Sequence, residues 1–239
     1  MRRPGFLITG TDTGVGKTFV GCGIASALRR RGTRVAPFKP VESGCQPGPG
    51  TNELIPADAI LLRQACATDA PLETICPYRF RQPIAPWVAA QREGREIEPS
   101  FLAWRFGELA STHDLVIVET AGGILVPLAD RFHFGDLARL LELPVLVVAG
   151  SKLGVINHTL LTLEFLRSSG LTVLGCVLNH PYSTGEPGQE PALETNAETL
   201  RKLTGTRLFI FPPIADARGV EAHQQFDELA EYILKALEG

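Results

Sequence analysis

Short apolar runs alternate with stretches of helical periodicity along nearly the whole chain. The runs are rich in Val, Ile and Leu and alternate little with polar residues, which is typical of strands buried on both faces of a parallel sheet. We predict strands at 5–9, 34–38, 115–119, 145–149, 173–178 and 208–211. Apolar residues spaced by three and four positions predict helices at 17–31, 57–67, 99–112, 136–142, 156–169, 194–203 and 224–237.

This order of elements predicts an α/β fold, namely a three-layer, doubly wound domain with a mostly parallel sheet. A chain of 239 residues with 44% hydrophobic content fits one such domain over residues 1–239. Ligands of such sheets bind outside the carboxyl ends of the strands. We therefore expect the functional residues to follow the predicted strands directly.

A glycine-rich segment, GTDTGVGKT at 10–18, lies between the first predicted strand and the first predicted helix. Glycines let backbone N–H groups turn toward phosphate oxygens, and the helix N-terminus adds about half a positive charge. Lys17 would reach the β- and γ-phosphates, and the Thr18 hydroxyl would ligate Mg²⁺. The segment predicts a phosphate-binding loop (P-loop) for a nucleoside triphosphate; the alternative is an ordinary glycine-rich turn. Five residues separate Gly10 from Gly16, one more than usual, so Thr11 stands where the first glycine is expected.

Three charged residues stand at other predicted element ends. Glu119 closes an apolar strand, as does the Mg²⁺-binding acid of the second nucleotide motif; alternatively it caps the next turn. Lys39 follows the second strand and either points into the same crevice or is a solvated surface lysine. Asp58, in the first turn of a predicted helix, is either a helix-dipole carboxylate or a second Mg²⁺ ligand.

The strands in the second half of the chain end in further polar residues. The segment 150–158 leads from the fourth strand into a helix, whose free N–H groups suit an anion such as a carboxylate. His158 in that helix is either a catalytic base or a structural histidine. Asn179 and residues 212–214 follow the last two strands, where a purine would lie, and an amide can pair with adenine through its donor and its acceptor.

Composition and charge exclude several classes of partner. The net charge is -3 and no basic stretch favours nucleic acid or a membrane surface. No apolar run reaches the roughly 18 residues of a membrane span, and the basic N-terminus leads into a strand without a signal cleavage site. The cysteines are odd in number and scattered, without a Cys-x-x-Cys pair, so we expect reduced cytoplasmic thiols. Cys22 and Cys176 lie in apolar surroundings, whereas the polar loop around Cys45 predicts an exposed thiol.

Two long regions, 40–56 and 71–99, have little regular patterning and are rich in Pro. Long loops in a compact domain are usually functional or disordered. We therefore expect these regions to contribute to the site or to lack fixed structure.

Taken together, the motifs resemble those of the dethiobiotin synthetase family, a branch of the P-loop NTPases. The matching segments occur in the family's order and are 10–18, 39–44, 58–59, 77–86, 118–123, 127–128 and 152–158. The five-residue spacing in the phosphate loop is the spacing of that family. The chain departs from the family at Gly14, where some relatives carry an acid, at Thr120, which replaces a glycine, and at Trp87, where a histidine is expected. A substrate-contacting tyrosine near Thr195 is not evident.

The resemblance implies an ATP- and Mg²⁺-dependent ligase of biotin biosynthesis. One amine of 7,8-diaminononanoate captures CO₂ as a carbamate, and the carbamate oxygen attacks the ATP γ-phosphate. The second amine then displaces phosphate from the carbamic–phosphoric anhydride, giving dethiobiotin, ADP and phosphate. This route needs no nucleophilic side chain, in agreement with the lack of a convincing Ser-His-Asp or Cys-His set.

The resemblance also implies roles for individual residues. Lys17 and Lys39 are expected to be catalytic, neutralising the triphosphate and stabilising the carbamate. The expected Mg²⁺ ligands are Thr18, Asp58 and Glu119. The expected substrate contacts are Thr13, Lys39, Ser43 and the N–H groups of Val155, Ile156 and Asn157. The expected nucleotide contacts are Gly14, Val15, Gly16, Lys17, Thr18, Phe19, Asp58, Glu119, Gly122, Asn179, His180, Pro213, Ile214 and Ala215. In this family the helix that begins near Val155 comes from the partner subunit, so a cytoplasmic homodimer with active sites at its interface is expected.

Three other nucleotide-dependent classes fit less well. A partitioning-type ATPase usually carries an extra lysine at the start of the phosphate loop and often ends in a basic helix, whereas residues 226–232 are acidic. A GTPase switch typically reads guanine with Asn-Lys-x-Asp, which residues 179–182 do not supply. A cobyrinate-type amide synthetase adds a glutaminase domain, for which 239 residues leave no room.

Overall fold

The computed structural model describes residues 5–180, 190–213 and 220–238, and its central element is a six-stranded sheet. The strand order is β12-β11-β10-β1-β7-β2, and each neighbouring pair is parallel. The strands are β1 (Gly5–Gly10), β2 (Val35–Phe38), β7 (Leu115–Gly123), β10 (Val145–Gly150), β11 (Val173–His180) and β12 (Leu208–Pro213). All six predicted strands are therefore confirmed, and five of them extend beyond the predicted carboxyl end.

Successive residues of these strands face two separate cores, as the pleat of a strand requires. Leu7 packs into one core with Val145 and Val147, whereas its neighbours Phe6 and Ile8 pack into the other. Because both faces are buried, the strands consist of continuous apolar runs.

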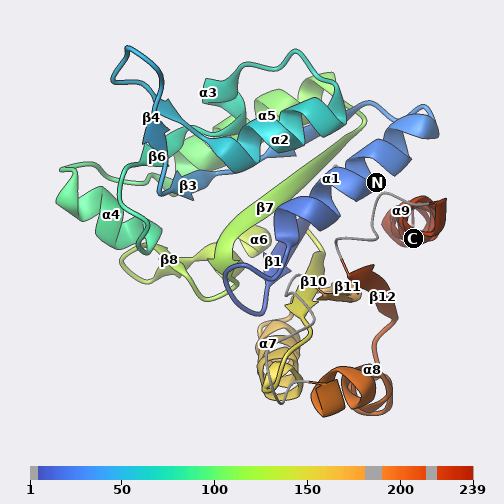
Figure 1. Cartoon of the computed structure of the whole chain (residues 1–239). Helices are drawn as coiled ribbons and strands as arrows, with labels where there is room; N and C mark the ends of the chain where they lie inside the picture. The colour runs from blue at the N-terminus through green and yellow to red at the C-terminus, as the bar shows by residue number, and fades with distance from the viewer. Residues whose placement is uncertain (1–4, 181–189, 214–219, 239) are drawn as a thin grey trace.

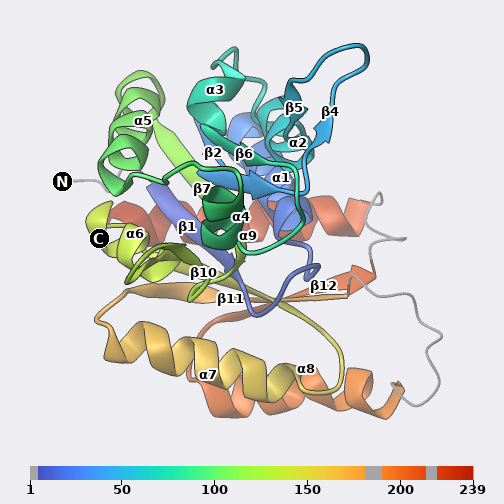
Figure 2. The ribbon, with the colours of Figure 1, turned by 90° about the vertical axis from the view of Figure 1, so that its left-hand side faces the viewer.

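Helices cover both faces and complete the three layers (Figures 1 and 2). One face carries α1 (Lys17–Arg30), α2 (Ala57–Cys66) and α9 (Val220–Glu238). The other face carries α5 (Pro99–Thr112), α6 (Phe134–Leu140) and α7 (Val155–Ser168), and α8 (Glu190–Thr204) packs beside α7. The predicted doubly wound α/β class is confirmed, and α8 and α9 both begin before the predicted residue.

The two long Pro-rich regions contain short elements that were not predicted. They hold β3 (Val41–Ser43), β4 (Gln46–Pro47), β5 (Leu54–Ile55), α3 (Leu72–Ile75), β6 (Tyr78–Phe80) and α4 (Pro86–Arg92). Farther along, β8 (Pro127–Ala129) pairs with β9 (Phe132–His133). These elements are too short to show a period, and long-range contacts hold them, such as the parallel pairing of β3 with β6. Both long regions are therefore ordered.

The cysteines are all free thiols. The expectation that Cys45 is exposed is wrong: only 4% of the residue is accessible. The pairing of β3 with β6 folds its loop inward, and the Cys45 N–H donates to the Phe80 carbonyl at 2.9 Å. Cys176 is buried as expected, whereas Cys22 is only half-buried. Within the described ranges, no helix combines the length and the apolarity needed to cross a bilayer.

Candidate active site

The glycine-rich segment forms a tight loop between β1 and α1. Gly14 and Gly16 have φ values of +75° and +89°, a region that side chains rarely adopt. A Cβ at Gly10 would lie 2.6 Å from the Asp12 carbonyl oxygen and 2.9 Å from the Lys17 Nζ, so this position also requires glycine. These backbone constraints explain the glycines of the predicted phosphate loop.

Two charged side chains hold the loop in shape. The Lys17 ammonium donates to the Asp12 carbonyl at 3.2 Å, across the loop. The Asp12 carboxylate accepts the Thr13 N–H at 2.7 Å and pairs with Lys152, after β10, at 3.2 Å. The Thr13 N–H, together with Lys152, holds the pKa of Asp12 below its usual value. The loop is therefore closed on itself and linked to the neighbouring strand end.

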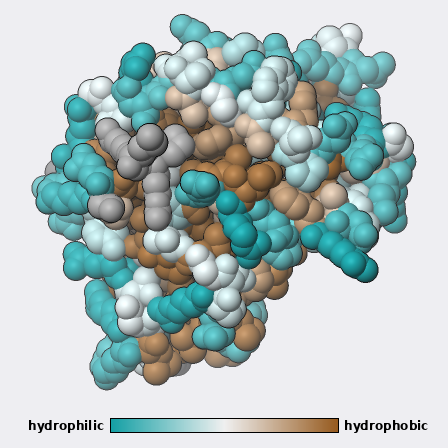
Figure 3. Space-filling view, turned by 180° about the vertical axis from the view of Figure 1, so that it is seen from behind, coloured by the Kyte–Doolittle hydropathy of each residue, from teal (hydrophilic) through white to brown (hydrophobic). Residues whose placement is uncertain are grey.

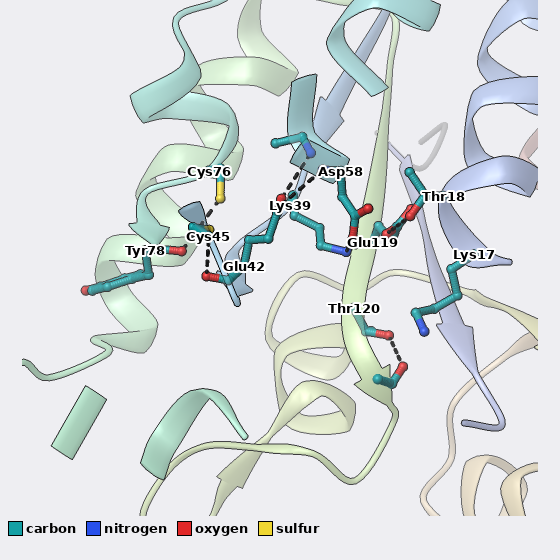
Figure 4. Close-up of polar contacts among 12 residues, drawn as sticks. Lys17, Thr18, Lys39, Glu42, Cys45, Asp58, Cys76, Tyr78, Glu119 and Thr120 are labelled. Atoms are coloured by element: carbon teal, nitrogen blue, oxygen red, sulfur yellow. Dashed lines mark hydrogen bonds and ion pairs between the residues drawn. The ribbon is translucent and has the colours of Figure 1, made fainter. Parts of the chain in front are cut away.

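A polar cluster lies beside this loop, where β2 ends and next to the middle of the longer strand β7 (Figure 4). The Lys39 ammonium donates to Glu119 Oε1 at 2.5 Å and to Asp58 Oδ2 at 2.9 Å. The Thr18 hydroxyl donates to the same Glu119 oxygen at 2.9 Å. Residues 101 positions apart along the chain thus meet at one point, as the parallel sheet predicts.

The charges of this cluster depend on one another. Burial disfavours the Lys39 ammonium, but Glu119 and Asp58 outweigh burial, and the pKa of Lys39 lies above its ordinary value. Burial also disfavours the Asp58 carboxylate, but Lys39 outweighs burial, and the pKa of Asp58 lies below its ordinary value. The cluster therefore favours a charged Lys39 and a charged Asp58.

Lys17 is electrostatically different from Lys39. Burial, together with the positive charge of Lys39, lowers the pKa of Lys17 to about 8. Lys17 has no carboxylate within hydrogen-bond distance in the described part of the chain, since its partner is the neutral Asp12 carbonyl. A buried ammonium of this kind is suited to an anionic ligand.

The loop and the cluster line one cavity of about 700 Å³. The predicted site residues on its surface are Thr13, Gly14, Gly16, Lys17, Thr18, Lys39, Ser43, Asp58, Glu119 and Gly122. Ten predicted residues from four separate segments thus meet around one space.

Four predicted nucleotide contacts lie outside the lining of this cavity. The Val15 side chain is 1% exposed and packs into the core, and the Phe19 ring packs edge-on against Phe226 at 5.5 Å between centroids. Asn179 donates from Nδ2 to the Val15 carbonyl at 2.9 Å, and its Oδ1 has no hydrogen-bond partner among the described residues. His180 Nδ1 lies 2.6 Å from the Phe211 carbonyl oxygen. Asn179 therefore joins β11 to the phosphate loop, whereas its contact with a purine stays a prediction.

The remaining predicted residues lie at α7 and after β12. Val155 begins α7, and its N–H donates to the Lys152 carbonyl at 3.1 Å. Residues 155–157 do not line the cavity of their own subunit, so their contact with substrate stays a prediction that needs a second subunit. His158 is likewise absent from the lining. Ile214 and Ala215 lie outside the described residues, as does the Pro213 side chain.

Several further residues line the cavity, although no individual role was predicted for them. Pro83, Ile84, Ala85, Pro86, Ala121 and Val126 form an apolar side, and Glu42 adds a buried carboxylate. For the first four residues the available signals were the Pro-rich composition of region 71–99 and the matching segment 77–86. Nothing local distinguishes Glu42, because its partners lie 16 and 17 positions further along the chain.

The oxygen atoms of the cluster are of the kind that Mg²⁺ prefers. Among the residues that the structure describes, no three His, Cys, Asp or Glu side chains form a metal-binding group. Mg²⁺ is usually held by only one or two carboxylates together with substrate phosphates. Glu119 Oε2 is buried without a hydrogen-bond partner in the described ranges, and Thr18, Asp58 and Glu119 all offer hard oxygen atoms. This set is therefore adequate for Mg²⁺ bound with a nucleotide.

The chain is similar in sequence and fold to several known proteins. A family model described as an AAA domain matches residues 4–217. The chain is 47% identical over 200 residues to the ATP-dependent dethiobiotin synthetase BioD of Anaeromyxobacter dehalogenans, covering 84% of this chain and 85% of that protein. It is 38% identical over 229 residues to the protein of the same name from Aquifex aeolicus, covering 95% and 96%.

The fold is also similar to that of a solved ATPase. The cell division ATPase MinD of Pyrococcus furiosus superposes with a TM-score of 0.54 at 19% identity, covering 97% of this chain and 99% of that one. At this identity the likeness concerns the fold alone. The sequence relatives cover most of both chains at well above 30% identity, and the chain therefore belongs to the ATP-dependent dethiobiotin synthetase family.

Proposed function

We propose that this enzyme uses ATP and Mg²⁺ to join CO₂ to 7,8-diaminononanoate and to close the ureido ring of dethiobiotin. The observation that carries the proposal is the single cavity shared by the phosphate loop and the Lys39–Asp58–Glu119 cluster. Phosphoryl transfer depends mainly on positioning and on charge neutralisation, and the cavity offers residues for both. The family's ATP-dependent reaction is consistent with this arrangement.

The phosphate loop would hold the triphosphate. Lys17 has a lowered pKa and a neutral partner, so its ammonium gains most from an anionic oxygen. Backbone N–H groups of the loop and of the first turn of α1 add donors at the helix N-terminus. Thr18, Asp58 and Glu119 would hold Mg²⁺, which when bound supplies positive charge at the β- and γ-phosphates.

Lys39 would stabilise the reacting carbamate. An ammonium has three N–H donors, and two of those of Lys39 point to Glu119 and Asp58. The third is available for a carbamate oxygen and for the anhydride formed from it. Because Lys39 is buried, its charge acts in a low-dielectric setting where such contacts are strongest.

The residues around Lys39 would orient the diamine. Thr13 and Ser43 provide hydroxyl groups for an amine or for the carbamate, and Ile84 and Val126 provide apolar surface for the methylene chain. The carbamate oxygen then takes the γ-phosphoryl group from ATP, leaving ADP. The second amine attacks the carbonyl carbon and expels phosphate, so that every bond change is carried by substrate atoms and no side chain is modified.

The proposed enzyme is a cytoplasmic homodimer. The N–H groups at the start of α7 do not line the cavity of their own subunit, so a partner has to bring them to the substrate carboxylate. Leu153 and Leu161, before and within α7, are 78% and 61% exposed. In Figure 3 apolar surface extends to the lower end of the molecule, where α7 and α8 lie, which suits contact with a second copy.

The proposal is tested by diamine-dependent phosphate release. The protein receives ATP, Mg²⁺ and bicarbonate, with 7,8-diaminononanoate present or omitted, and the products are analysed by mass spectrometry. Release that requires the diamine and yields a product of dethiobiotin mass supports the proposal. Equal release without the diamine would contradict it and favour a switch ATPase.

A further inference from the structure

Glu42 is a buried carboxylate that the proposed reaction does not use. It lies in β3 and is 7% exposed. Its Oε1 accepts the N–H of Asp58 at 3.0 Å, and its Oε2 accepts the N–H of Ala59 at 3.1 Å. Both carboxylate oxygens therefore bind the first turn of α2, as the dashed lines in Figure 4 show.

This contact replaces a cap that α2 does not have locally. The residue at the N-cap position is Pro56, and no side-chain hydrogen bond caps the helix from there. The first-turn N–H groups of a helix have no intrahelical acceptor and need one from elsewhere. A carboxylate is favourable at this position because it also complements the helix dipole.

The contact has a direct consequence for the cluster, because Asp58 is one of the two residues held. With its backbone fixed by Glu42, the Asp58 carboxylate lies 2.9 Å from the Lys39 Nζ. Lys39 itself is three residues before Glu42, at the end of β2. One carboxylate thus joins the segment that carries Lys39 to the helix that carries Asp58.

The strand that carries Glu42, β3, is itself held in place by its neighbours. β3 pairs with β6 in register, with Val41 opposite Tyr78 and Glu42 opposite Arg79. Val41 is fully buried, so a shift of β3 would disturb the core. Because β3 is fixed by this pairing and burial, the hydrogen bonds from Glu42 also fix the first turn of α2.

We propose that Glu42 is the positioning residue for Asp58, setting the place of its carboxylate for Mg²⁺ bound with the nucleotide. The inference deepens the proposed function and rests on it for the identity of the bound nucleotide. Residues that orient a metal ligand typically change metal affinity by about 10- to 100-fold when they are removed.

The first test measures metal binding without turnover. Mn²⁺, which replaces Mg²⁺ and is visible by EPR, is titrated into the protein with a non-hydrolysable ATP analogue. Glu42→Ala should weaken Mn²⁺ binding by about 10-fold or more, whereas analogue binding without metal should stay within about twofold because Glu42 does not touch the phosphate loop. Glu42→Gln, which keeps one acceptor oxygen, should show a smaller loss of Mn²⁺ affinity. If the alanine variant does not fold, this variant provides the test, and wild-type Mn²⁺ affinity in it would contradict the inference.

The second test is a double-mutant cycle with Asp58→Asn. If Glu42 acts through Asp58, adding Glu42→Ala to Asp58→Asn should cost little further Mn²⁺ affinity, a strong departure from additivity. Asp114→Ala is the matched control, because it removes a carboxylate that accepts a backbone N–H at 2.9 Å at the opposite end of the sheet. This control should leave Mn²⁺ binding unchanged.

Two results would overturn the inference: wild-type Mn²⁺ affinity in folded Glu42→Ala, or additive losses in the cycle. A different result would contradict the proposed function: wild-type protein that binds Mn²⁺ and the analogue but forms no product of dethiobiotin mass.

Discussion

Lys39 and Glu119 form an ion pair almost entirely out of water, with 3% and 0% of their side chains exposed. Such pairs rarely stabilise a fold more than apolar residues of similar size, because desolvation offsets the attraction. Lys39 also pairs with Asp58 at the surface of the cavity. A costly cation at this position is better explained by the reaction than by stability.

Lys39→Ala should therefore lower diamine-dependent turnover by about 10² or more, as the loss of a preorganised charge often does. The exposed Lys202, which pairs with Glu198 on α8, offers a matched control in Lys202→Ala. Phosphate release measures the effect, and a melting curve shows whether each variant is folded. Near-normal turnover of Lys39→Ala would contradict the catalytic role.

Lys17 should reduce stability at neutral pH. Its pKa falls from 10.5 to about 8 on folding, so between these values the unfolded chain binds more protons and stability rises with pH. Well below pH 8 the ammonium is charged in both states, and its burial together with the nearby charge of Lys39 costs about 3 kcal/mol. Lys17→Met should therefore be more stable than the wild type by up to about this amount at pH 7, although it loses the phosphate contact.

The advantage of Lys17→Met should shrink by about half between pH 7 and about pH 9.5, as the wild-type lysine loses its proton. Urea denaturation at the two pH values measures it. Lys235→Met, at a lysine that is 74% exposed, should show no comparable pH dependence. A pH-independent advantage of Lys17→Met would show that burial does not depress the pKa of this lysine.

At the scale of elements, α1 depends on close packing against α9. Gly23 faces the Phe226 ring, which also contacts Phe19 at 5.5 Å and Phe211 at 4.5 Å between ring centroids. A Cβ at Gly23 would lie 2.2 Å from that ring. Because the ring is held by two other aromatic residues, it has little freedom to move away.

Gly23→Ala should accordingly lower the free energy of unfolding by about 1–3 kcal/mol through overpacking. Gly107, in the middle of α5, provides the opposite case, since a Cβ there meets nothing within 4 Å. Gly107→Ala should raise the free energy of unfolding by about 0.5–1 kcal/mol, because alanine favours the helix. Chemical denaturation measures both, and a stabilised Gly23→Ala would show that α9 adjusts without cost.

Elements with a clear period were predictable, and those without one were not. The strand at 145–149 was identified from its apolar residues alone, because both of its faces are buried. β3 and β6 have three residues each and exist through their mutual pairing and burial, which no local window contains. Cys45 was misjudged for the same reason, since its burial follows from that pairing.

At the scale of the whole molecule, the proposal that two subunits share each active site can be tested by mixing variants. Lys39→Ala removes the cation from one part of the site, and Asn157→Glu places a repelling carboxylate at the start of α7. If a site combines Lys39 of one subunit with α7 of the other, each mixed dimer regains one intact site. Random exchange of two inactive variants should then restore about a quarter of wild-type turnover.

This experiment mixes the two variants after dissociation and compares turnover with that of each variant alone. A mixture of Lys39→Ala with Asp58→Asn is the control, because both residues belong to the cluster of one subunit, so each site of a mixed dimer carries one of the changes and neither site is intact. No recovery with Asn157→Glu would contradict a site shared between subunits. A single species of monomer mass in sedimentation would contradict the dimer itself.

The sequence by itself determined the layers, the six strands, the phosphate loop and the candidates Lys39, Asp58 and Glu119. Each of these follows from a local pattern: an apolar run, a period, a glycine spacing or a charge at a strand end. Only the tertiary structure decided that Lys39 bridges Asp58 and Glu119, and that Glu42 holds the first turn of α2. These contacts join residues 16 to 80 positions apart, and they depend on strand order and packing, which local patterns do not encode.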